Sequence, residues 1–107
     1  MSRSQAIKIV NKFAEKLKKE NFEFQEMYLF GSSASDTAGK WSDIDVAVVS
    51  DRFKKDWNKN EDLLWKLSLD IDSRIEPLGF EIKDFQNPDN FFAREIQHSG
   101  VRIRVVK

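Results

Sequence analysis

Residues 30–49 read FGSSASDTAGKWSDIDVAVV and carry the most informative pattern of the chain. A Gly-Ser pair ends an apolar run, a polar loop follows, and Asp43 and Asp45 lead into four small apolar residues. Because side chains alternate across a strand, we expect Asp43 and Asp45 on one face and Ile44 on the other. The nearly continuous apolar run is typical of a strand that is central in its sheet and buried on both faces.

The same segment predicts a site for a phosphate and a metal. Two carboxylates on one face repel each other unless a cation lies between them, and a hard divalent cation takes oxygen ligands. Gly31 lets the backbone approach a phosphate closely, Ser32 adds a hydroxyl donor, and a helical turn over residues 33–36 would present N–H groups to the anion. Each element alone also fits an ordinary Gly-Ser turn with two solvated aspartates, but their order and spacing favour the site.

The rest of the chain alternates helical and strand patterns. Ser2 and Gln5 form a capping box, Asn21 suits a left-handed helix end, and Asn58 with Glu61 is expected to cap a second helix. Pro77 indicates an edge strand or a bulge. The patterns predict helices over residues 2–21, 58–71 and 87–97, and strands over residues 24–30, 43–49, 75–82 and 101–105. We therefore expect an α/β (α+β) fold, with a small mixed sheet of about four strands flanked by helices.

Composition limits the classes of function. The 107 residues form one domain, 1–107, and the 18 basic residues balance the 18 acidic ones, which disfavours a nucleic-acid ligand. No cysteine is present, so a catalytic metal would be held mainly by oxygen, which favours Mg²⁺ or Mn²⁺ over zinc. No apolar run reaches the ~18 residues of a membrane span, and no signal-peptide core is visible. We expect a cytoplasmic protein without a membrane partner.

The pattern resembles the nucleotidyltransferase superfamily of DNA polymerase beta type, and in particular its minimal nucleotidyltransferases. Members carry Gly-Ser, a variable gap and Asp-x-Asp in the next strand. The resemblance implies that Asp43 and Asp45 hold the metals and that Gly31 and Ser32 hold the β- and γ-phosphates. Ser33 stands where many relatives have arginine. The predicted nucleotide-binding residues are Gly31, Ser32, Ser33 and Ser42.

Relatives also use a third acidic residue on a later strand to complete the metal site and help deprotonate the attacking hydroxyl. The run Arg74-Ile75-Glu76-Pro77 resembles that strand, so Glu76 is the predicted third catalytic and metal-binding residue. Glu81 and Asp84 are the alternatives. A second Asp-x-Asp, at residues 70–72, lacks an upstream Gly-Ser and is interpreted as a helix end, with Asp72 a candidate for the rim of the site.

The resemblance implies an Mg²⁺-dependent (or Mn²⁺-dependent) enzyme that transfers NMP, with ATP the favoured donor, to a hydroxyl. Such proteins pair with a separately encoded helical protein of the HEPN type in toxin–antitoxin modules, which makes that partner the expected acceptor, in a homo- or hetero-oligomer. One alternative is a non-catalytic antitoxin that neutralises its partner by binding. Another is a nucleotidyltransferase acting on a small molecule or an RNA end. Trp41 is expected to pack across the loop rather than stack on a base, and Lys40 to face water.

Overall fold

The computed structural model describes residues 1–35 and 42–104, so the expectations for Asp36, Lys40, Trp41 and Val105 lie outside the described residues. A four-stranded sheet of order β3-β2-β1-β4 forms the centre of the molecule. Strand β1 is antiparallel to β2 and β4, and β2 is parallel to β3, so the predicted mixed sheet is confirmed. The strands are β1 Glu26–Phe30, β2 Ile44–Val49, β3 Ile75–Phe80 and β4 Val101–Arg102. The helices are α1 Arg3–Lys19, α2 Trp57–Leu69, α3 Ile82–Gln86 and α4 Phe91–Ser99, with 3-10 turns η1 Gly31–Ser33 and η2 Asp51–Lys54.

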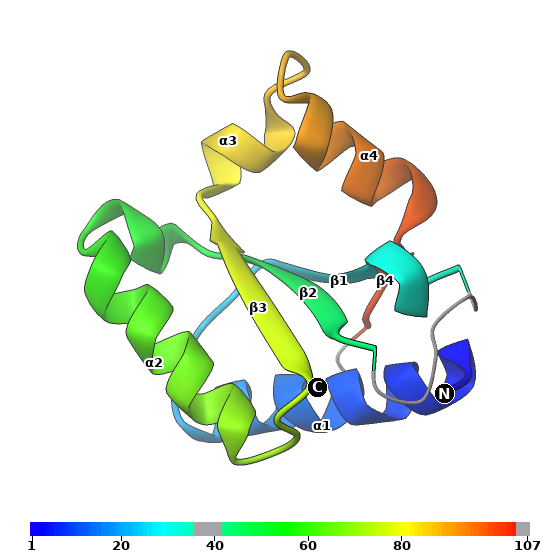
Figure 1. The fold of residues 1–107 in the computed structure, drawn as a ribbon. Coiled ribbons are helices and arrows are strands. Elements are labelled where there is room, and N and C mark those ends of the chain that lie inside the picture. The colour runs from blue at the N-terminus through cyan, green and yellow to red at the C-terminus, as the bar shows by residue number, and fades with distance from the viewer. Residues whose placement is uncertain (36–41, 105–107) are drawn as a thin grey trace.

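Helices cover both faces of the sheet: α1 and α2 lie on one side, and α3 and α4 lie on the other (Figure 1). The alternation along β2 produces this arrangement. Val46 and Val48 enter the core under α1 and α2, whereas Ala47 and Val49 enter the core under α3 and α4. Burial on both faces explains the continuous apolar run, and the predicted central position of this strand is confirmed.

Two predicted helix boundaries are confirmed in detail. Ser2 and Gln5 form a reciprocal capping box at the start of α1. Asn21, just after the end of α1, adopts a left-handed conformation with φ 59°. The N–H of Phe22 then donates to the carbonyl of Leu17, which closes the end of the helix.

Other predicted boundaries were wrong. Helix α2 begins at Trp57, because the side chain of Asp56 accepts a hydrogen bond from the N–H of Lys59, and Asn58 and Glu61 do not form its cap. Strand β3 ends at Phe80, and residue 82 begins the unpredicted helix α3. The last helix begins at Phe91 rather than near residue 87, because Asn90 caps it. Strand β1 begins at Glu26 rather than at residue 24, and β4 has only two residues.

The outer edge of β3 presents no unpaired N–H group. Its even-numbered residues face β2: the carbonyl of Arg74 accepts from the N–H of Ile44, and the carbonyl of Phe80 accepts from the N–H of Ser50, the residue after β2. Of the outward positions, Ile75 donates to the carbonyl of Asp72, and Pro77 has no N–H. Gly79 donates to the Glu61 carboxylate at 3.1 Å. The predicted edge position of Pro77 is therefore confirmed, and Glu61 covers the strand from α2.

Candidate active site

Three carboxylates meet where β2 and β3 begin. Asp45 and Glu76 are paired residues of these parallel strands, and Asp43 lies two residues before Asp45. All three belong to the sheet face that α3 and α4 cover further along, because residues 47 and 49 point to that side. The alternative residues Glu81 and Asp84 follow the opposite end of β3. The structure thus brings together the three predicted catalytic residues.

The carboxyl groups perturb one another. The Glu76 carboxyl lies within hydrogen-bonding reach of the carboxyl groups of Asp45 and Asp43. Burial raises the pKa of Asp45; the hydrogen bond with Glu76 opposes this rise, and the charge of Asp43 adds to it. The pKa of Glu76 is raised by loss of solvation and then by the charges of Asp43 and Asp45. The cluster therefore carries a repulsion that a bound cation would relieve.

Gly31 joins the phosphate turn to this cluster. Phe30 pairs with Asp45 across β1 and β2, so the next residue begins η1 directly beside the Asp45 side chain. Gly31 has φ +74°, a left-handed conformation that other residues rarely adopt. A Cβ at this position would collide with Oδ2 of Asp45. Glycine avoids both the left-handed strain and this collision, and the space that a Cβ would need holds the Asp45 carboxylate.

The predicted serines occupy different environments. Ser32 is exposed within the turn, and Ser42 is partly exposed before β2. Ser33 is buried, and its hydroxyl donates to the carbonyl of Asp43 at 3.1 Å. This bond ties the turn to the segment that carries the aspartates. The Ser33 side chain thus holds the Asp43 backbone in position, and no pattern in the sequence indicated this bond.

The donor set suits a hard divalent cation, since carboxylate oxygens are the ligands that Mg²⁺ and Mn²⁺ prefer. In residues 1–35 and 42–104, no group of three or more acidic or histidine side chains is arranged closely enough to hold a metal ion as it stands. Glu76 is exposed, so its side chain has room to change rotamer. The salt bridges between described residues involve neither Glu76 nor the two aspartates.

The second Asp-x-Asp has a structural role. Asp70 is the C-cap of α2, as the helix-end interpretation predicted. Asp72 forms an ion pair with Arg74 at 2.8 Å and also accepts a hydrogen bond from its backbone N–H. These hydrogen bonds lower the pKa of Asp72. The carbonyl of Arg74 accepts from the N–H of Ile44, so the pair fixes the start of β3 just before Glu76. The sequence could have indicated this ion pair, because an acidic and a basic residue lie two positions apart just before a predicted strand.

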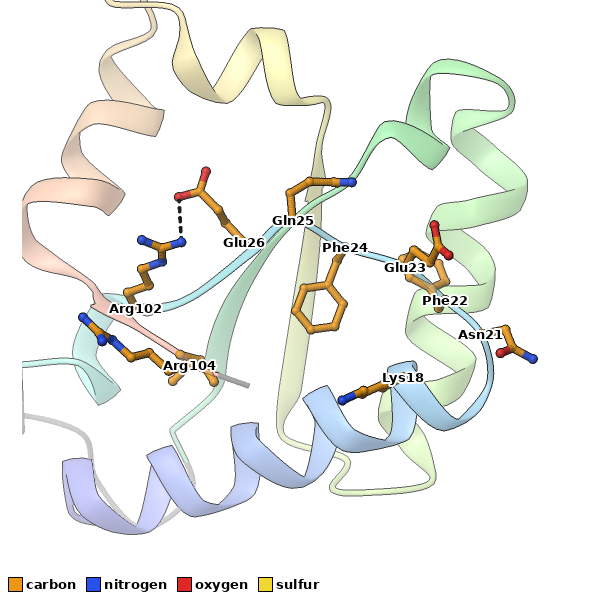
Figure 2. Close-up of a pocket in the computed structure, with 10 residues that line it drawn as sticks. Lys18, Asn21, Phe22, Glu23, Phe24, Gln25, Glu26, Arg102 and Arg104 are labelled. Atoms are coloured by element: carbon orange, nitrogen blue, oxygen red, sulfur yellow. Dashed lines mark ion pairs between the residues drawn. The ribbon is translucent and has the colours of Figure 1, made fainter. Parts of the chain in front are cut away.

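A hollow of about 960 Å³ lies elsewhere in the molecule, beside the C-terminal half of α1 (Figure 2). Its lining includes Lys18 and Arg104, and an ion pair of 3.9 Å between Arg102 and Glu26 crosses its edge. None of the predicted site residues lines this hollow. The hollow is therefore separate from the carboxylate cluster, which remains the candidate active site.

Comparisons with known proteins identify the family and the fold of the chain. The family model of the nucleotidyltransferase domain matches residues 8–101. A candidate nucleotidyltransferase from Sulfolobus solfataricus, known from a crystal structure at 1.40 Å resolution, has a similar fold with a TM-score of 0.66. The match covers 94% of this chain and 80% of that chain at 17% identity, which supports the predicted fold. None of the curated proteins matches the chain. Within the described residues, no helix is long and apolar enough to cross a membrane. The predicted resemblance is confirmed, and the chain belongs to the nucleotidyltransferase domain family.

Proposed function

We propose that this protein transfers a nucleoside monophosphate from a nucleoside triphosphate, with ATP the favoured donor, to a hydroxyl group, and that it requires Mg²⁺ or Mn²⁺. One observation carries the proposal: the glycine turn and the carboxylate cluster touch, because Gly31 has room beside Asp45 only without a Cβ. A phosphate-binding turn and an oxygen-ligand metal site in contact are the two parts that nucleotidyl transfer requires.

The residues divide the reaction between them. Asp43, Asp45 and Glu76 would hold the metal, which when bound neutralises charge on the triphosphate. Gly31 and Ser32 would hold the β- and γ-phosphates and so orient the α-phosphorus toward the acceptor. The hydroxyl oxygen then forms a bond to that phosphorus, the bond to the β-phosphate oxygen breaks, and pyrophosphate leaves. Glu76 would accept the hydroxyl proton, since a carboxylate beside a metal-bound hydroxyl is chemically suited to that role.

Binding of the donor tests the first half of this proposal. Isothermal titration calorimetry with MgATP should detect binding to the wild-type protein and none to the double variant Asp43→Asn, Asp45→Asn. The matched control removes two exposed carboxylates of the α2 region, Asp62→Asn with Asp70→Asn, and should bind as the wild type does. Equal binding by all three proteins would refute the site assignment.

We propose a hydroxyl of a HEPN-type helical partner as the acceptor, following the family resemblance. Incubation of the protein with MgATP and the product of the adjacent gene, followed by mass spectrometry of that product, tests this step. The expected result is a mass increase equal to one AMP residue, lost in the double variant. A partner that is inhibited but keeps its mass would support the non-catalytic antitoxin instead.

A further inference from the structure

A half-exposed aromatic side chain lies on the same face of the sheet as the carboxylates. Phe92, in the first turn of α4, is 49% exposed although it contacts two other aromatic rings. Its ring centroid lies 5.7 Å from that of Phe30 and 5.9 Å from that of Phe80, both in edge-type geometry. Such contacts are favourable and fix the ring, so Phe92 is held in place while about half of its surface faces solvent.

This ring contacts a residue that is a direct neighbour of the candidate active site. Phe30 pairs with Asp45 across β1 and β2, so these two side chains lie on the same face of the sheet as direct neighbours. Phe30 also immediately precedes Gly31, the first residue of the phosphate turn. The aromatic ledge, defined as Phe30 and Phe92, is therefore continuous with both the carboxylates and the turn.

We propose that the aromatic ledge binds the nucleobase of the donor nucleotide by stacking; this inference rests on the proposed function. The ligand that fits has phosphates at one end and a flat aromatic group at the other, because Phe30 and Gly31 are consecutive residues. A nucleotide has this construction. The hydroxyl acceptor would meet the α-phosphorus and has no need to contact the phosphate turn.

The ledge should accept different bases. Stacking on an aromatic side chain is tolerant, since every nucleobase has a π-face. Asn90, the polar residue just before the two phenylalanines of α4, has both ends of its amide engaged. Its oxygen accepts from the N–H of Ala93 at 3.1 Å, and its nitrogen donates to the carbonyl of Asp84 at 3.0 Å. These bonds hold the Asn90 amide in place. The ledge itself should therefore not distinguish adenine from guanine nucleotides, and a preference for ATP would come from groups outside it.

Calorimetry with three probes tests the proposal: MgATP, MgGTP and magnesium tripolyphosphate, which has no base. Wild-type protein should bind both nucleotides more tightly than tripolyphosphate. Phe92→Leu keeps an apolar side chain against Phe30 and Phe80 but removes the ring, and should weaken both nucleotides roughly 10- to 100-fold. Its affinity for tripolyphosphate should stay unchanged. The matched control Phe91→Leu makes the same change at the adjacent residue, which is 80% exposed, and should bind all three probes normally.

The outcomes separate this inference from the function beneath it. If the wild type bound tripolyphosphate as tightly as the nucleotides, the proposal that the ledge binds the base would be refuted. The proposed phosphate and metal site would not be affected. An equal loss of all three probes in Phe92→Leu would also overturn it, because the ring would then be only structural. No binding of any probe to the wild type would overturn both proposals. The comparison of probes on the wild type needs no variant, so it stands even if Phe92→Leu folds poorly.

Discussion

Gly31→Ala is the substitution for which the structure makes the sharpest prediction. A non-glycine residue at φ +74° costs roughly 1–2 kcal/mol, and pushing the Asp45 side chain off its rotamer costs roughly 0.5–1.5 kcal/mol more. With an unfolding entropy of about 2.1 cal/mol/K per residue, the combined loss of roughly 1.5–3.5 kcal/mol lowers Tm by about 7–16 °C. The displaced Asp45 carboxylate should also weaken MgATP binding, because it is a predicted metal ligand.

The matched control is Asn21→Ala. Asn21 is the other described residue with positive φ, at 59°, and it lies at the end of α1, outside the candidate site. Alanine tolerates the left-handed conformation less well than asparagine, so the substitution should cost up to about 1 kcal/mol without touching Asp45. Thermal melts followed by circular dichroism, with calorimetry of MgATP, should show that both variants lose stability and that only Gly31→Ala loses affinity. If Gly31→Ala melted within about 2 °C of the wild type and bound MgATP normally, the reasoning would be refuted.

Three further predictions follow from the same contacts. Asp45→Asn should raise the Tm of the metal-free protein, because it removes a repelling charge, and should abolish the rise in Tm that Mg²⁺ gives the wild type; a lower metal-free Tm would contradict this. Ser33→Ala removes the buried hydrogen bond to Asp43 and should cost about 1 kcal/mol in denaturant unfolding while weakening MgATP binding; unchanged binding would mean that the bond does not position the site. Burial raises the pKa of Glu61, so its contribution to stability is greatest at low pH and is lost as pH rises through that pKa. Glu61→Gln keeps an acceptor for the N–H of Gly79 but does not titrate. Thermal melts from about pH 3.5 to 7 should therefore show the stability of this variant rising relative to the wild type. A stability difference that is constant, or that changes in the opposite direction, would contradict this.

Local signals in the sequence predicted local structure well. The capping box of Ser2 and Gln5 depends on residues three apart, and the alternation around Asp43 and Asp45 depends on one strand, so both could be read directly. The start of α2 could not. Asp56 and Asn58 are both good caps, and the choice depends on tertiary contacts: the side chain of Asn60 is bonded to Arg52 in η2 and to the carbonyl of Asp56.

The assembly of the site depends on contacts between distant segments. Glu76 was predicted from its similarity to a family strand, but its pairing with Asp45 depends on the register of two parallel strands that a helix separates in the sequence. The same holds for the bond of Ser33 to Asp43 and for the collision that excludes a side chain at Gly31. Helix α3 was missed because it has five residues and its N-cap, Glu81, makes no capping hydrogen bond.

The edge of β3 determines how other chains can approach the candidate site. A strand adds to a sheet by exchanging main-chain hydrogen bonds, and an edge that offers acceptors but no donors is a poor template for this exchange. Pro77 and the carboxylate of Glu61 thus oppose edge-to-edge aggregation on the strand that carries Glu76. We therefore expect a protein that presents its hydroxyl to this site to dock through side chains or a helix. It should not bind by adding a β-strand to β3.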